Sequence, residues 1–212
     1  AHILTEFGKS ARMSRNNTIR RQDYQIITEM IKDGSTVLDL GCGDGSLLLH
    51  LKQTKNVSGY GVEKDDRNVL ASLSNGINVV QSDLEHGLEG FGAGTFDYVV
   101  LSLTLQAVHQ TEAIIDEMLR VGRQVIVTFP NFGFWRHRLQ IFLGQAPVSK
   151  ELPYQWYDTP NVHVLTINDF ENFCVSHNAR ILDRIVLSER GRPIDAIPNL
   201  MGALAVYRFD KG

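Results

Sequence analysis

The residues of this chain best suited to chemistry are one acid and three glycines at alternating positions. Asp39 is followed by Gly41, Gly43 and Gly45, with Cys42 between the first two glycines. Apolar residues lead into this turn, and a leucine-rich segment of helical character follows it. Backbone N–H groups at the start of that helix would bind negative charge, while Asp39 would attract a cationic group. The turn is therefore suited to a ligand that carries both a carboxylate and an ammonium group.

The spacing of the glycines separates this turn from the dinucleotide-binding one. Dinucleotide-binding turns read G-x-G-x-x-G, whereas the turn after Asp39 reads G-x-G-x-G. Glycines at every second position let the backbone turn sharply and lie against a bulky ligand without Cβ collisions. A pyrophosphate is therefore a poorer fit to this turn than a zwitterionic ligand.

Two more acids stand at the ends of the next two predicted strands. Residues 57–65 and 77–83 read as strands, and Glu63 and Asp83 lie at their carboxyl ends. Glu63 follows Gly41 by 22 residues, a position from which a carboxylate can accept hydrogen bonds from both ribose hydroxyls. Open α/β sheets bind ligands at the carboxyl ends of their strands, so the three acids predict one site at that edge.

Each acid also has a plainer interpretation. Asp39 could cap the following helix or accept hydrogen bonds from loop amides. Glu63 and Asp83 could be solvated residues of their loops. The joint pattern, in which three acids end three consecutive strands, favours ligand binding over these alternatives.

The order of elements predicts an α/β fold with a mostly parallel sheet and helices on both faces. Further strands are expected at residues 96–108, 123–131, 181–191 and 202–210, the last of them antiparallel. Helices are expected at residues 23–34, 65–76, 110–122 and 166–178. The first of these helices should bring Tyr24 near the ligand-binding edge.

Residues 131–165 form a longer connection than a simple crossover needs, which predicts an insertion over the ligand-binding edge. Helical spacing predicts that three of its aromatic residues form a lid core: Phe134, Trp135 and Phe142. Three others alternate in an extended stretch, so some of them should line a pocket or a partner surface: Tyr154, Trp156 and Tyr157.

Composition excludes several classes of function. The 212 residues suit one domain, expected at 13–212, with residues 1–12 as a leader or flexible extension. A net charge of −3 and a pI of about 6.2 argue against nucleic-acid binding through bulk charge. Cys42 and Cys174 are far apart and lack metal-ligand spacing, which fits a reducing cytosol. This spacing also predicts no metal site. No apolar run reaches 18 residues, so no membrane span is expected.

The D-x-G-x-G-x-G turn, with acids at the following strand ends, resembles the first motifs of class I S-adenosylmethionine-dependent methyltransferases. This resemblance implies a Rossmann-like fold with a seven-stranded sheet, mostly parallel, whose last strand is antiparallel. It implies S-adenosylmethionine or S-adenosylhomocysteine as the ligand. The cofactor-binding residues that it implies are Asp39, Gly41, Cys42, Gly43, Gly45, Glu63, Asp83, Leu84, Ser102 and Leu103.

Longer segments resemble one particular family, the MetW proteins of bacterial methionine biosynthesis. They are VLDLGCGDGSLL, FPNFGFWRHRLQI and LPYQWYDTPNVHVLTINDF, and the similarity begins at about Met13. The resemblance implies a cytoplasmic protein that binds S-adenosylmethionine and acts as an accessory or regulatory partner of homoserine O-acyltransferase. The alternative is an active small-molecule methyltransferase whose 131–165 insertion forms the acceptor pocket.

The residues do not identify a catalytic group. No N-P-P-[YF] motif follows the predicted fourth strand, which disfavours amino-methylation of DNA or glutamine. No cysteine or lysine stands in a nucleophilic setting. Four residues near the expected edge are candidate bases, namely His109, Tyr154, Tyr157 and His163. Each has a stronger structural interpretation, so the catalytic residue is left unassigned.

Overall fold

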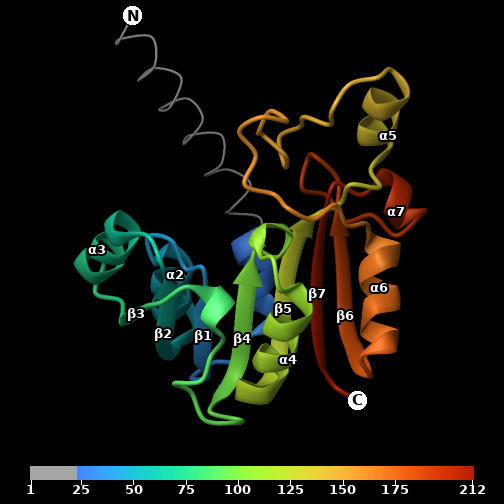
Figure 1. Ribbon diagram of the computed structural model, residues 1–212. Helices are drawn as coiled ribbons and strands as arrows, with labels where there is room; N and C mark the ends of the chain where they lie inside the picture. The colour runs from blue at the N-terminus through green and yellow to red at the C-terminus, as the bar shows by residue number, and fades with distance from the viewer. Residues whose placement is uncertain (1–22) are drawn as a thin grey trace, which may run out of the picture.

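A computed structural model describes residues 23–212 of the chain, and the expected leader at residues 1–12 lies outside them. One sheet of seven strands runs through the described part, in the order β3-β2-β1-β4-β5-β7-β6 (Figure 1). The strands are β1 Thr36–Leu40, β2 Ser58–Glu63, β3 Val79–Gln81, β4 Phe96–Ser102, β5 Gly122–Pro130, β6 Ala179–Leu187 and β7 Leu204–Lys211. Strands β1 to β5 pair in parallel, while β7 lies antiparallel between β5 and β6. The predicted sheet with its antiparallel last strand is confirmed.

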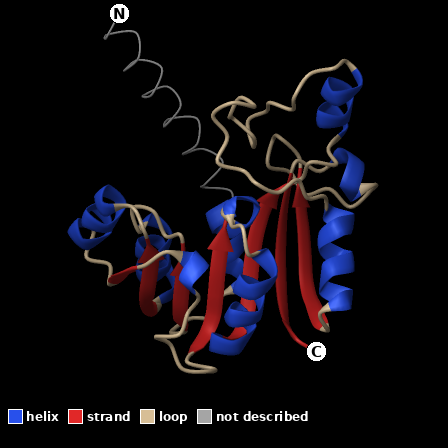
Figure 2. Ribbon diagram, viewed as in Figure 1, coloured by secondary structure: helices blue, strands red, loops and turns tan. Residues whose placement is uncertain are grey.

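Helices cover both faces of this sheet (Figure 2). The helices of the described part are the one at residues 23–30, α2 Ser46–Lys55, α3 Asp66–Ser74, α4 Thr111–Val121, α5 Trp135–Phe142, α6 Ile167–Ser176 and α7 Pro198–Met201. Of these, α5 lies above the strand ends rather than on a face of the sheet (Figure 1). Two single 3-10 turns, η1 Leu84–His86 and η2 Leu105–Ala107, follow β3 and β4. Strands and helices therefore alternate along much of the chain, as the sequence pattern predicts.

The core has two halves because successive residues of each central strand face opposite sides of the sheet. On β4, Val99 and Leu101 pack with α4 and α6, whereas Tyr98 and Val100 pack with the helix at residues 23–30 and with α2. Every one of these four side chains is at most 3% exposed. A strand buried on both faces reads as a continuous apolar run, which is why β4 is recognisable in the sequence.

Several strands end earlier than the sequence pattern predicts, and β4 and β3 do so beside the site. The strand expected over residues 96–108 stops at Ser102, because Leu103 adopts a left-handed φ of 52° and η2 begins two residues later. The strand expected over residues 77–83 is confined to Val79–Gln81, and Asp83 instead caps η1. Beyond Ser102 apolar residues continue through Leu103, Leu105 and Val108, so the apolar pattern alone overestimates the length of β4.

Residues 131–165 lie above the carboxyl ends of the strands and contain α5 (Figure 1). Phe134 is 3% exposed, as predicted for a lid core. The same prediction is wrong for Trp135 and Phe142, which are 40% and 85% exposed. Helix α5 packs through one edge only, so its remaining apolar side chains face outward.

Among residues 23–212, no helix combines the length and the apolar character that crossing a bilayer requires.

A candidate ligand site at the glycine turn

The turn between β1 and α2 has a backbone that needs glycine. Gly41 and Gly45 have left-handed φ values of 67° and 74°, a region that residues with a Cβ rarely adopt. A Cβ on Gly41 would lie 3.0 Å from the hydroxyl of Thr104, and one on Gly45 would lie 2.9 Å from the hydroxyl of Ser72. The turn is therefore both sharply bent and closely packed against two neighbouring segments.

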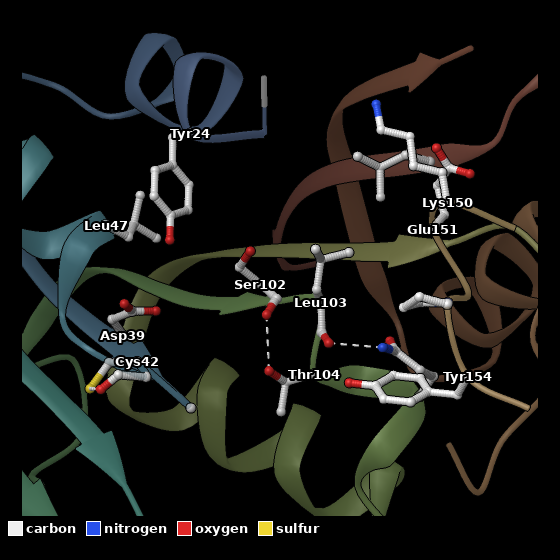
Figure 3. A pocket seen from close by; sticks show the side chains of 15 residues that line it. Tyr24, Asp39, Cys42, Leu47, Ser102, Leu103, Thr104, Lys150, Glu151 and Tyr154 are labelled. Atoms are coloured by element: carbon white, nitrogen blue, oxygen red, sulfur yellow. Dashed lines mark hydrogen bonds between the residues drawn. The ribbon is translucent and has the colours of Figure 1, made fainter. Parts of the chain in front are cut away.

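A cavity of about 180 Å³ opens beside this turn (Figure 3). Its walls come from the turn, the end of β4, the helix at residues 23–30 and the 131–165 segment. Six of the ten predicted cofactor-binding residues line it, namely Asp39, Gly41, Cys42, Gly43, Ser102 and Leu103. Tyr24 also lines the cavity, as expected from the position of its helix. The tertiary structure thus brings together residues that are more than 60 positions apart.

The other four predicted residues lie outside the cavity wall. Gly45 is the N-cap residue of α2, and Leu84, the first residue of η1, packs against the core. Asp83 accepts a hydrogen bond from the backbone N–H of Glu85, 3.1 Å away, and lies 3.6 Å from the ammonium of Lys64. These contacts lower the pKa of the Asp83 carboxyl, the bond from Glu85 most of all. Asp83 thus lies outside the cavity wall, with its side chain 35% exposed.

Glu63, the fourth of them, supports the glycine turn from behind. One of its carboxylate oxygens accepts a hydrogen bond from the backbone N–H of Gly43 at 2.9 Å. The other accepts from the N–H groups of Lys64 and Asp65 at 2.8 and 2.9 Å. A carboxylate offers about four lone-pair sites, so about one remains for a further donor. The sequence pattern predicted two ribose hydroxyls at this carboxylate, and the structure leaves room for one without rearrangement.

The end of β4 presents its backbone to the cavity in a strained conformation. Leu103 holds its left-handed φ because its N–H donates to both the carbonyl and the hydroxyl of Thr128, each 3.0 Å away. The hydroxyl of Thr104 donates to the carbonyl of Ser102 at 2.9 Å (Figure 3). A non-glycine residue in this region costs of order 1–3 kcal/mol and indicates a functional constraint.

Sequence analysis missed the carboxyl group that stabilises this strand end. Asp23 is fully buried, and the hydroxyls of Ser102 and Thr128 donate to one of its oxygens at 2.7 and 3.0 Å. Within residues 23–212 its other oxygen, Oδ1, finds no hydrogen-bond partner. Burial raises the pKa of Asp23 to about 6, although the two hydroxyl bonds oppose that shift. An acid on the polar edge of a helix carries no local signal of this role, since its partners are 79 and 105 residues away.

Asp23 should make the stability of the protein depend on pH. Its pKa is raised from 3.8 to about 6, so between these values the unfolded chain has released a proton that the folded chain retains. The unfolding free energy therefore falls by about 3 kcal/mol as the pH rises through this window, and Asp23 adds no further change above it. We expect Asp23→Asn, which does not titrate, to remove this part of the pH dependence. Urea denaturation of both proteins between pH 4 and pH 8 measures the difference, and identical slopes would contradict the assignment.

The cysteine of the turn is buried, and its thiol is poorly ionised at neutral pH. Cys42 is 7% exposed, and burial, helped by the charges of Asp39 and Glu63, raises its pKa to about 12. The thiolate form, which is the nucleophile, is therefore scarce at neutral pH. Cys42 serves as a small packing residue beneath the loop, against Gly61 and Ser72.

The candidate bases do not converge on one place. Tyr154 lines the cavity, whereas Tyr157 is 70% exposed and packs edge-on against Trp156. His109 and His163 contact one another through the carbonyl of His109, 3.2 Å from Nε2 of His163, and lie in a separate groove beside α4. The cavity also contains residues that sequence analysis did not select, among them Gln106, Lys150 and Glu151.

Comparison with known proteins identifies similar chains. The family model described as "Methionine biosynthesis protein MetW" matches residues 21–209. The bifunctional methionine biosynthesis protein MetXA/MetW of Rhodopirellula baltica is 38% identical over 202 residues, which cover 89% of this chain and 32% of that protein. The ribosomal protein L11 methyltransferase of Cupriavidus pinatubonensis is 30% identical over 105 residues, covering 49% of this chain and 35% of that protein. The chain spans about a third of the length of these curated relatives.

Solved structures with low sequence identity share the fold. A SAM-dependent methyltransferase from Thermotoga maritima, described as a possible histamine N-methyltransferase, has a TM-score of 0.69 at 15% identity, covering 100% of this chain and 97% of that one. Magnesium protoporphyrin IX methyltransferase from Synechocystis, solved with bound SAH, has a TM-score of 0.60 at 16% identity, covering 95% and 84%. At these identities the likeness shows the Rossmann-like methyltransferase fold alone.

Proposed function

The chain belongs to the MetW family of methionine biosynthesis, and on that premise we propose that it binds S-adenosylmethionine or S-adenosylhomocysteine and regulates homoserine O-acyltransferase as an accessory partner. The observation that carries the ligand proposal is the cavity shared by the glycine turn, Asp39 and the end of β4. Its elements lie at the carboxyl edge of the sheet, where open α/β folds bind ligands.

The residues present fit such a nucleoside. The methionine portion would lie along the turn at Gly41 and Gly43, with its ammonium towards Asp39, which is 3% exposed, and towards the backbone of Ser102. A ribose hydroxyl would donate to the remaining lone-pair site of Glu63. When bound, S-adenosylmethionine supplies a sulfonium that activates its methyl group for in-line transfer. A structurally similar methyltransferase is described with SAH bound, which is consistent with this ligand class.

Two observations support the partner proposal. The relative from Rhodopirellula baltica carries both parts of its name, MetXA and MetW, in one chain. Two proteins that are fused in one organism often associate as separate chains in another.

The second observation is that the end of α5 exposes apolar side chains. Leu139, Ile141, Phe142 and Leu143 are 48%, 59%, 85% and 63% exposed. Exposed apolar side chains gathered in one short segment are typical of a protein–protein interface.

The same segment can couple the ligand to the partner. Residues between positions 131 and 165 both line the cavity and carry the exposed patch on α5. A ligand that binds one arrangement of this segment more tightly shifts its population by that difference in affinity. The partner's affinity then changes by the same factor, which is the requirement for regulation.

Co-purification with the acyltransferase, and its activity with and without this protein, test the partner proposal. We expect Ile141→Ser/Phe142→Ser to weaken the complex at least tenfold, because central apolar anchors dominate interfaces. Val175→Ser is the matched control, since Val175 is 78% exposed on α6. Absence of a complex, together with unchanged acyltransferase activity, would contradict the proposal.

The active-methyltransferase alternative is favoured by one observation, namely that the 131–165 segment walls the same cavity as the glycine turn. In that case the segment would hold the methyl acceptor. Incubation with donor labelled in its methyl group and a metabolite extract should then yield a labelled product. Absence of transfer across broad extracts would leave the accessory role.

A further inference from the structure

The side of the cavity opposite the glycine turn is built from one short loop. Lys150, Glu151 and Tyr154 reach the cavity from this loop, across from Tyr24, Asp39 and Cys42 (Figure 3). The two sides differ in origin, because one belongs to the sheet edge and the other to the 131–165 segment. The cavity therefore has a second wall with its own polar groups.

This loop is held in place by its own hydrogen bonds. The side-chain amide of Gln140 on α5 donates to the carbonyl of Val148 at 3.0 Å and accepts from its N–H at 3.1 Å. Ser149 and Leu152 close a turn, in which the N–H of Ser149 donates to the carbonyl of Leu152 at 3.0 Å. Leu152 is only 3% exposed and anchors the turn. The loop thus presents Lys150 and Glu151 from a defined position.

The polar ends of these side chains have few partners. Across residues 23–212, the ammonium of Lys150 and the hydroxyl of Tyr154 make no hydrogen bond or ion pair. The carboxylate of Glu151 accepts from the hydroxyl of Ser149 at 3.3 Å and from its own backbone N–H. Burial, followed by the charge of Glu189, raises the pKa of Glu151, while the charge of Lys150 opposes this shift. A half-buried carboxylate with weak bonds is stabilised by a cationic ligand group.

We propose that this wall is a second subsite, which binds a small α-amino acid beside the nucleoside. The carboxylate of the amino acid would pair with Lys150, its ammonium group with Glu151, and its side chain would lie against Pro153 and Tyr154. This inference rests on the proposed function, because it assigns the glycine-turn side to the nucleoside.

The subsite is tested with the full chain saturated with S-adenosylhomocysteine, so that free amino acids cannot occupy the turn. The twenty standard amino acids are screened by thermal shift, and those that bind are titrated calorimetrically. We expect at least one to bind, with at least tenfold loss on N-acetylation, which removes the ammonium, and on methyl esterification, which removes the carboxylate. Lys150→Met and Glu151→Gln should each weaken binding at least tenfold. Lys52→Met, an exposed lysine on α2, should leave it unchanged.

The outcomes separate this inference from the proposed function. If S-adenosylhomocysteine binds but none of the twenty amino acids does, the subsite is wrong and the nucleoside site stands. If Lys150→Met and Glu151→Gln weaken S-adenosylhomocysteine binding instead, both residues belong to the nucleoside site and the subsite is again wrong. If S-adenosylhomocysteine itself fails to bind the wild-type protein, the proposed function fails. Amino-acid binding that depends on Lys150 and Glu151 would still support the subsite in that case.

Discussion

Glu63→Ala should weaken S-adenosylhomocysteine binding by tenfold to about a hundredfold, as measured by calorimetric titration. The substitution removes the acceptor proposed for a ribose hydroxyl, a charge-assisted bond worth ~1.5–3 kcal/mol. It also leaves the N–H groups of Gly43, Lys64 and Asp65 without the carboxylate that now accepts from all three. The turn would then lose its support as well as its ligand contact.

Two further variants are compared with Glu63→Ala, one at a second predicted cofactor-binding acid and one as a control. Asp83→Ala should also weaken binding, but less, because Asp83 lies outside the cavity wall and is already bonded to Glu85 and paired with Lys64. Glu29→Ala removes an exposed acid from the helix at residues 23–30 and should have no effect. Unchanged affinity in both Glu63→Ala and Asp83→Ala, with normal unfolding curves, would refute the assignment of these acids.

Gly61→Ala should destabilise the protein and abolish ligand binding, although Gly61 lies outside the cavity. A Cβ at this buried position of β2 would stand 2.3 Å from Sγ and 2.9 Å from Cβ of Cys42. Because Cys42 belongs to the glycine turn, the turn must move to relieve the overlap. Overpacking of this kind costs typically 1–3 kcal/mol, which urea denaturation would register as a lower midpoint.

Gly90→Ala is the matched control, because a Cβ there meets no atom within 4 Å. It should unfold at the wild-type urea concentration. Adding Cys42→Ala to Gly61→Ala removes the closest contact, that with Sγ, and should recover part of the lost stability. Wild-type stability and affinity in Gly61→Ala alone would show that the turn is not packed as the structure describes.

Much of the sheet and the glycine turn could be predicted from the sequence, because their causes are local. Central strands such as β4 are buried on both faces and so read as apolar runs. The left-handed turn at Gly41 and Gly45 requires glycine, and a required residue type is visible in a sequence. Where the cause is not local, prediction was weaker: β4 ends at Ser102 because Thr128, on another strand, holds Leu103 in its left-handed bend.

The sequence by itself therefore determined the family, the order of the elements and the edge of the sheet at which the glycine turn lies. Only the tertiary structure decided that Asp23 lies buried beneath Ser102, that Glu63 supports the turn, and that Lys150 and Glu151 close the far side of the cavity. The physical reason is the range of the interactions. Periodicity and glycine geometry act over a few residues, whereas a buried carboxyl or a cavity wall depends on which distant segments pack together.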